Sequence, residues 1–121
     1  MRRGKPLQQV GRKAAREQPA RDEMRKQVLA DCGGRCVARK AIPEVKCWAS
    51  GYLEVHELVD RSVRPGVALD HNYGVALCHA HHEWVTADAS RARDRGFSFF
   101  SWDWEPALLR AQRLKAEVWT W

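Results

Sequence analysis

The sequence lacks an apolar run long enough to cross a bilayer, so we expect no membrane-spanning segment. It also lacks an apolar segment after the basic residues 1–5, so we expect no secretory signal peptide. The protein is therefore expected in the cytoplasm, where thiols stay reduced. There is no internal repeat, and a length of 121 residues suits one domain, or one domain with tails.

Cysteine is scarce as well. The chain has only four cysteines, and a reducing compartment argues against pairing them in disulfide bonds. A chain of this size buries a modest core, so a bound metal or oligomerisation would help to hold the fold. We therefore interpret the cysteines as metal ligands.

Positive charge is present in excess, and it is concentrated near the N-terminus. The formal net charge is +6; residues 1–26 carry nine Lys and Arg against three Asp and Glu, which leaves twelve of each for residues 27–121. We interpret residues 1–21 as a flexible basic arm. Such an arm either contacts nucleic-acid phosphates or is a solvated tail that aids solubility, and charge alone does not choose between the two.

The spacing of apolar and turn residues predicts an α+β fold. The expected elements are, in chain order, a helix from about residue 22 to the Gly33-Gly34 pair, strands at 52–56 and 74–78, a helix opening at 80–82, a short helix that Asp88 caps and that runs to Arg95, and a last helix at 107–118. The domain proper would then span residues 22–104, with a C-terminal helix in residues 105–121 packed on it or on a partner.

Half of a metal site is visible in Cys78-x-x-His81, at a predicted strand-to-helix turn that suits tetrahedral zinc. Two more soft ligands are needed, and Cys36 and Cys47 are the best candidates, although ten residues separate them. Cys32 falls on the apolar face of the first helix and is interpreted as a core residue; the rival interpretation is a half-knuckle with Cys36. The sequence thus predicts a structural zinc bound by Cys36, Cys47, Cys78 and His81.

Two further histidines suggest a second metal. His56 ends the first predicted strand, and His82 follows His81 on the helix. Because successive helical residues point about 100° apart, His81 and His82 can serve different metals. His82 alone would read as a surface histidine, but beside His56 and a zinc turn we favour a ligand.

Residues 53–58 read Leu-Glu-Val-His-Glu-Leu, residues 75–82 read Val-Ala-Leu-Cys-His-Ala-His-His, and a polar loop joins them. Over about residues 36–86 this arrangement resembles the HNH endonuclease family. The resemblance implies a ββα-metal fold (strand, loop, strand, helix) around one catalytic metal, with a separate zinc knuckle. It also implies that His56 and His82 bind the catalytic metal and that Glu57 is the general base.

The chain departs from the family pattern at two places. Glutamate is a weaker base than histidine, with an ordinary pKa near ~4.3, so the roles can be swapped, with His56 as base and Glu57 as ligand. The family's loop asparagine usually lies five residues before the first cysteine of the turn, which here is Tyr73, whereas Asn72 is one residue further. A one-residue insertion would restore Asn72 as the residue that pins the loop. His71 is a candidate third ligand.

The resemblance implies hydrolysis of DNA phosphodiester bonds by a single divalent metal, and His and Glu ligands admit Mg, Mn, Ni, Co or Zn. Small HNH proteins of this kind resemble those encoded by phages, some beside packaging genes, which would place the protein in the host cytoplasm with packaging proteins as partners. The residues expected to hold DNA phosphates are Arg2, Arg3, Lys5, Arg12, Lys13, Arg61 and Arg64.

Other functions compete with the nuclease. The departures at Glu57 and Tyr73 allow a zinc-stabilised DNA-binding or packaging accessory module that has lost catalysis. Six tryptophans are many for this length. The four near the C-terminus can stack on bases, but we favour a place in the core or in an interface. These four are Trp102, Trp104, Trp119 and Trp121. A protein-interaction module that uses them is the third hypothesis.

Overall fold

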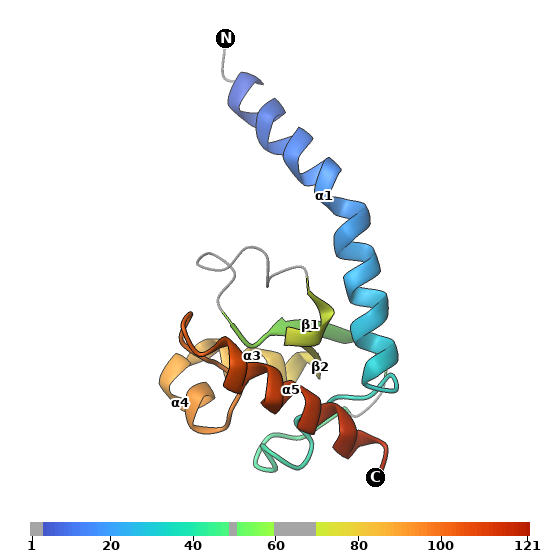
Figure 1. The fold of residues 1–121 in the computed structure, drawn as a ribbon, viewed down its shortest axis with the longest axis vertical. Helices are drawn as coiled ribbons and strands as arrows, with labels where there is room; N and C mark the ends of the chain where they lie inside the picture. The colour runs from blue at the N-terminus through green and yellow to red at the C-terminus, as the bar shows by residue number, and fades with distance from the viewer. Residues whose placement is uncertain (1–3, 49–50, 60–69) are drawn as a thin grey trace.

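The computed structural model describes residues 4–48, 51–59 and 70–121, with side chains from residue 18 onward. It confirms the α+β class: a two-stranded antiparallel sheet is surrounded by helices (Figure 1). The elements are α1 (Gly4–Asp31), β1 (Leu53–Glu57), the single 3₁₀ turn η1 (His71–Tyr73), β2 (Gly74–Cys78), α3 (His79–Ala87), α4 (Ala89–Asp94) and α5 (Trp104–Val118). No described helix combines the length and the apolar character that a membrane span requires.

Helix α1 begins at Gly4, well before the start expected near Asp22. Its N-terminal half extends away from the rest of the molecule (Figure 1). Residues 4–21 have no apolar stripe, but they are rich in Ala, Arg, Lys and Gln, which favour helix without one. The C-terminal end lies where it was predicted, because Gly33 and Gly34 take positive φ angles of 62° and 66°. The division of the chain into arm and domain stays a prediction.

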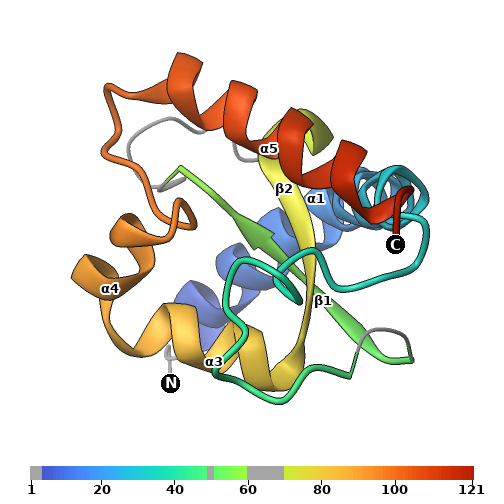
Figure 2. The ribbon, with the colours of Figure 1, turned by 90° about the horizontal axis from the view of Figure 1, so that it is seen from below.

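The two strands pair in the register that runs from Leu53 opposite Cys78 to Glu57 opposite Gly74 (Figure 2). Strand β2 has the predicted bounds, and β1 is shifted by one residue. Because side chains alternate along a strand, Glu54 and His56 share one face of β1, and Glu57 lies on the other.

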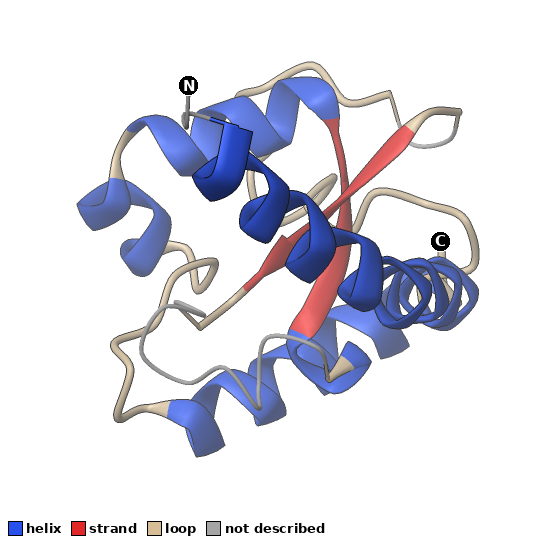
Figure 3. Cartoon of the chain, turned by 90° about the horizontal axis from the view of Figure 1, so that it is seen from above, coloured by secondary structure: helices blue, strands red, loops and turns tan. Residues whose placement is uncertain are grey.

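Helices cover both faces of this small sheet (Figure 3). On one face Val28 of α1 approaches Gly74 so closely that a Cβ there would lie 3.0 Å from its Cγ2 atom. On the opposite face α3 meets β1 through His82 and Glu54. Helix α5 packs beside β2 and η1 and buries Ala107, Ala111, Leu114 and Val118. Leu108 and Lys115 of this helix are half-buried.

The segment after α4 returns the chain to the end of β1. Asp88 caps α4, as predicted, by accepting a hydrogen bond from the Arg91 amide, and Gly96 follows the helix with φ 79°. The Phe99 amide then donates to the Leu58 carbonyl over 2.8 Å. This bond fixes the aromatic segment that follows α4 against the strand that carries His56.

The C-terminal tryptophans are mostly outside the core. Trp102, Trp104 and Trp119 are 70%, 40% and 68% exposed, and Trp121 is half-buried. The core interpretation is therefore wrong for the first three, because the face of α5 that meets the domain is made of small and aliphatic side chains. A place in an interface stays a prediction.

Candidate metal centre and the histidine cluster beside it

Three cysteines and one histidine meet where β2 enters α3. The sulfur atoms of Cys36, Cys47 and Cys78 and a ring nitrogen of His81 all lie within 4.8 Å of one another. All three sulfurs belong to free thiols. The sequence prediction of this group is confirmed: these four residues are close enough to hold a metal ion such as zinc.

The distances suit a tetrahedral ion. Zinc–sulfur and zinc–nitrogen bonds of ~2.3 and ~2.0 Å place the ligand atoms of a tetrahedron roughly 3.5–3.8 Å apart. The Nδ1 atom of His81 lies 3.5 Å from the sulfur of Cys36 and 3.3 Å from that of Cys78. The side chains therefore already have nearly the spacing that a metal would impose.

The long loop between Cys36 and Cys47 explains how ligands so far apart in sequence can work. It contains turns and no strand. Ile42 in its middle is fully buried, and its carbonyl oxygen lies 2.9 Å from His81 Nε2. A carbonyl only accepts, so Nε2 carries the hydrogen and the lone pair on Nδ1 faces the sulfurs. The loop thus fixes the tautomer that a metal ligand needs.

The sulfur atoms differ in their tendency to ionise. Burial raises the pKa of Cys36 and of Cys47. For Cys78 burial acts the same way, but hydrogen bonds from the backbone of His81 and Trp48 outweigh it and lower the pKa. Metal binding requires thiolates, and Cys78 is the sulfur of the three whose ionised form its surroundings favour.

Cys32 does not belong to this group. It is fully buried and packs in the hydrophobic core, and the metal-ligand group of the described residues does not include it. The interpretation of Cys32 as a core residue is confirmed, and the half-knuckle with Cys36 is wrong, because the helical turn at Val28–Cys32 directs this side chain into the core.

Beside the metal-ligand group, His56 and His82 lie in contact. Their ring centroids are 5.4 Å apart, and the ring planes meet at 67°. His56 comes from β1 and His82 from the first turn of α3, one residue after the ligand His81. The structure therefore brings together the two histidines that the sequence singled out.

A carboxylate that the sequence reasoning missed completes this cluster. One oxygen of Glu54 lies 2.5 Å from His82 Nδ1, and the other lies 2.9 Å from His79 Nδ1. These bonds hold the pKa of Glu54 below its ordinary value and raise that of His79. Strand alternation could have found Glu54, because it is two residues before His56 and so shares its face. We call Glu54, His56, His79 and His82 the histidine cluster.

His56 is held in the neutral form. Its Nε2 atom lies 2.5 Å from the Phe97 carbonyl oxygen, so Nε2 carries the hydrogen and Nδ1 keeps a lone pair. Burial, together with the neighbouring His82, lowers the pKa of His56 to about 4, although the Phe97 bond acts in the opposite direction. At neutral pH the ring is therefore uncharged. Glu57, by contrast, lies on the face of β1 opposite His56.

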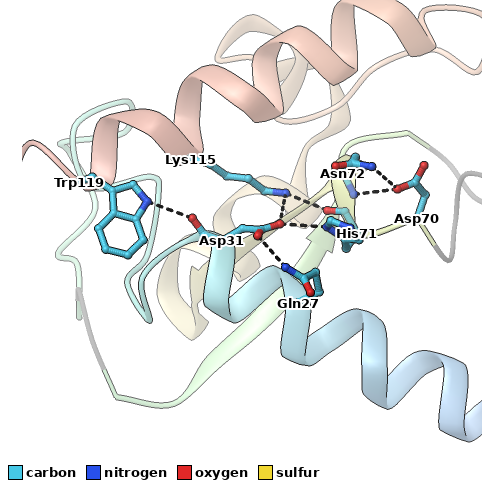
Figure 4. A network of polar contacts seen from close by, with 7 residues as sticks. All are labelled: Gln27, Asp31, Asp70, His71, Asn72, Lys115 and Trp119. Carbon is cyan, nitrogen blue, oxygen red and sulfur yellow. Dashed lines mark hydrogen bonds and ion pairs between the residues drawn. The ribbon is translucent and has the colours of Figure 1, made fainter.

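The loop residues lie in a different network (Figure 4). Asn72 donates from its side-chain amide to an Asp70 carboxylate oxygen over 2.8 Å, and among the described residues this amide has no hydrogen bond to the backbone. His71 Nδ1 lies 3.0 Å from an Asp31 carboxylate oxygen, and Lys115 donates to the His71 carbonyl over 2.8 Å. The structure thus holds His71, the candidate third ligand, with α1 and α5.

The residues expected to hold DNA are placed only in part. Lys5, Arg12 and Lys13 lie on the projecting half of α1. The remaining four lie outside the described residues: Arg2, Arg3, Arg61 and Arg64.

Comparison of the chain with protein-family models, with curated proteins and with solved structures found no match.

Proposed function

We propose that this protein is a metal-dependent nuclease of the HNH kind, which hydrolyses DNA phosphodiester bonds and is held together by a structural zinc. The observation that carries the proposal is the contact between His56 and His82 at the junction of β1 and α3. The two rings lie directly beside a Cys₃His group, with a carboxylate, Glu54, between the two elements.

The structural zinc would fix the position of His82. Zinc bound by Cys36, Cys47, Cys78 and His81 would tie the start of α3 to the loop before β1. Small domains gain much of their folding free energy from such an ion, about 10–16 kcal/mol in zinc-finger peptides. Since His82 follows His81 directly, the ion would also fix the position of His82 relative to the other residues of the histidine cluster.

In this mechanism His56 is the general base, and a divalent metal that lowers the pKa of the attacking water would offset the low pKa of the ring. Its Nε2 hydrogen is engaged by the Phe97 carbonyl, which leaves Nδ1 to take a proton from the attacking water. This assignment supports the swapped roles for the His56-Glu57 pair, but with Glu54 in place of Glu57 as the carboxylate of the site. Glu54 and His82 would hold the divalent metal, which supplies positive charge for the scissile phosphate.

A second candidate function is a zinc-stabilised DNA-binding or packaging accessory module without catalysis. Two observations favour it. Glu57 and the histidine cluster lie on opposite faces of β1. Within the described residues the Asn72 side chain bonds the Asp70 carboxylate and not the backbone. Both candidates share the zinc and the basic helix, and they differ only in chemistry.

Nicking of supercoiled plasmid separates the two. Protein with one zinc per chain, measured by mass spectrometry, is freed of loosely bound metal and then assayed with Mg²⁺, Mn²⁺, Ni²⁺ or Co²⁺. We expect metal-dependent nicking that His82→Ala abolishes while zinc content and far-ultraviolet circular dichroism stay unchanged. Protein that binds DNA and carries its zinc, yet nicks with none of these metals, would support the accessory module.

A further inference from the structure

An aromatic stack stands on the segment that supports His56. The rings of Phe100 and Trp102 are nearly parallel, at 5°, with centroids 4.9 Å apart. Trp102 is nevertheless 70% exposed. An indole with one face against a phenyl ring reaches that exposure only if its other face is open to solvent. The stack therefore ends in a free planar surface.

This surface is tied to the histidine cluster through the backbone. Phe97 accepts the hydrogen bond from His56, and Phe99 donates to Leu58 and forms a bridge with Val59. Trp102 follows Phe97 by five residues, so their Cα atoms are at most about 18 Å apart. A nucleic-acid strand with a rise of about 3.4 Å per nucleotide covers that distance in about five nucleotides.

A cation accompanies the stack. The guanidinium carbon of Arg93 lies 4.6 Å from the Phe100 ring centroid, and the side chain is exposed. Within the described part of the chain Arg93 makes no ion pair, so its charge is available to a phosphate. Flat aromatic faces beside an arginine are the arrangement that binds unpaired strands, because each base can stack while the cation holds the backbone.

We propose that Trp102 is a stacking platform for an unpaired nucleobase of the DNA strand whose backbone passes the histidine cluster. This inference rests on the proposed nuclease function and names its substrate class: DNA with a single-stranded region or a frayed end. Inside a duplex every base is already covered on both faces by its neighbours. Intact duplex therefore gains nothing from Trp102.

The test measures binding, so that it does not depend on cleavage. Zinc-loaded protein without added divalent metal is titrated into a fluorescein-labelled 20-nucleotide single strand and into the blunt duplex of the same sequence, with anisotropy as readout. We expect Trp102→Ala to weaken single-strand binding by roughly 5- to 100-fold and duplex binding by less than about twofold. Trp102→Phe, which keeps a ring on Phe100, should restore most of the loss.

Tyr52→Ala is the matched control, because Tyr52 is 74% exposed and belongs to no ring stack among the described residues. It should change neither affinity. The inference is overturned if wild-type protein shows no single-strand binding, or if Trp102→Ala weakens both DNAs equally or neither. Plasmid nicking by wild-type protein is scored separately. Selective loss of single-strand binding in a protein that never nicks would support the platform and reject the nuclease, whereas nicking with unchanged binding in Trp102→Ala would reject the platform alone.

Discussion

The carboxylate of Glu54 joins β1 to α3 by accepting a hydrogen bond from His82 Nδ1 over 2.5 Å. Glu57, three residues later, lies on the opposite face of the same strand. The two glutamates therefore make a matched pair of substitutions that differ mainly in which face loses its charge.

Glu54→Gln should lower plasmid nicking by about 10- to 100-fold. The substitution removes the negative charge with which Glu54 would bind the divalent metal and orient His82. Glu57→Gln should retain most of the activity. Initial rates at saturating metal, with zinc content as the control for folding, provide the comparison. The reverse ranking would restore Glu57 as the general base that the family resemblance implies.

Loss of one metal ligand should release the zinc. Cys47 is half-buried, whereas Cys36 and Cys78 are buried. Replacement of Cys47 therefore disturbs the packing least among the three cysteine ligands. Cys47→Ser should lower zinc from one ion per chain to a small fraction and should lower the melting temperature sharply, because the metal contributes directly to folding. Cys32→Ser alters a fully buried core residue outside the metal-ligand group and should keep one zinc. Equal zinc loss in both variants would mean that the ion is not bound by the four residues.

His56→Ala should lower nicking by about 10²- to 10⁴-fold, the usual contribution of a general base, without loss of zinc or of DNA affinity. His71→Ala is the control. The structure bonds His71 to Asp31, away from His56 and His82, so this variant should affect stability and leave the turnover of folded protein nearly unchanged. A large loss of turnover in His71→Ala at full folding would return His71 to the role of third ligand.

How far the sequence could lead is clear from four residues. Cys78 and His81 were predictable because ligand spacing at a strand-to-helix turn is a local pattern. The Ile42 carbonyl that orients His81 was not, because any residue supplies a carbonyl and only the path of the loop selects this one. The exposure of Trp102 could not be predicted from the sequence either, because the path of the backbone decides whether an aromatic side chain packs in the core or points to solvent. The start of α1 was predicted wrongly for a related reason: a segment with helix propensity but no apolar stripe gives no periodic signal.

Asp31 ties α1 to η1 and α5 (Figure 4). Its carboxylate accepts from Gln27 over 3.0 Å, and an oxygen lies 3.4 Å from Lys115 Nζ. Although burial opposes ionisation, these bonds and the one from His71 lower the pKa of Asp31. Its contribution to stability is therefore present above the ordinary value of 3.8 and is lost as pH falls below it.

Asp31→Asn should accordingly lower the free energy of unfolding by about 1–3 kcal/mol, the usual cost of removing a charged hydrogen-bonding partner. Urea unfolding at pH 7 and pH 5 measures the difference, which should not shrink between these two values because Asp31 stays ionised at both. A difference that disappears by pH 5 would show that the carboxylate titrates higher than its contacts imply.

The projecting half of α1 carries the last prediction, which concerns DNA affinity. If Lys5, Arg12 and Lys13 contact phosphates, replacing all three with alanine removes three phosphate contacts, so fewer counterions are released when the protein binds DNA. Alanine preserves the helix. The slope of log affinity against log salt should then become shallower by about 2.7. Arg113→Ala, on the exposed side of α5, should change the slope by less than one. Fluorescence anisotropy with a duplex from 50 to 300 mM salt measures both slopes, and an unchanged slope in the triple variant would remove α1 from the DNA interface.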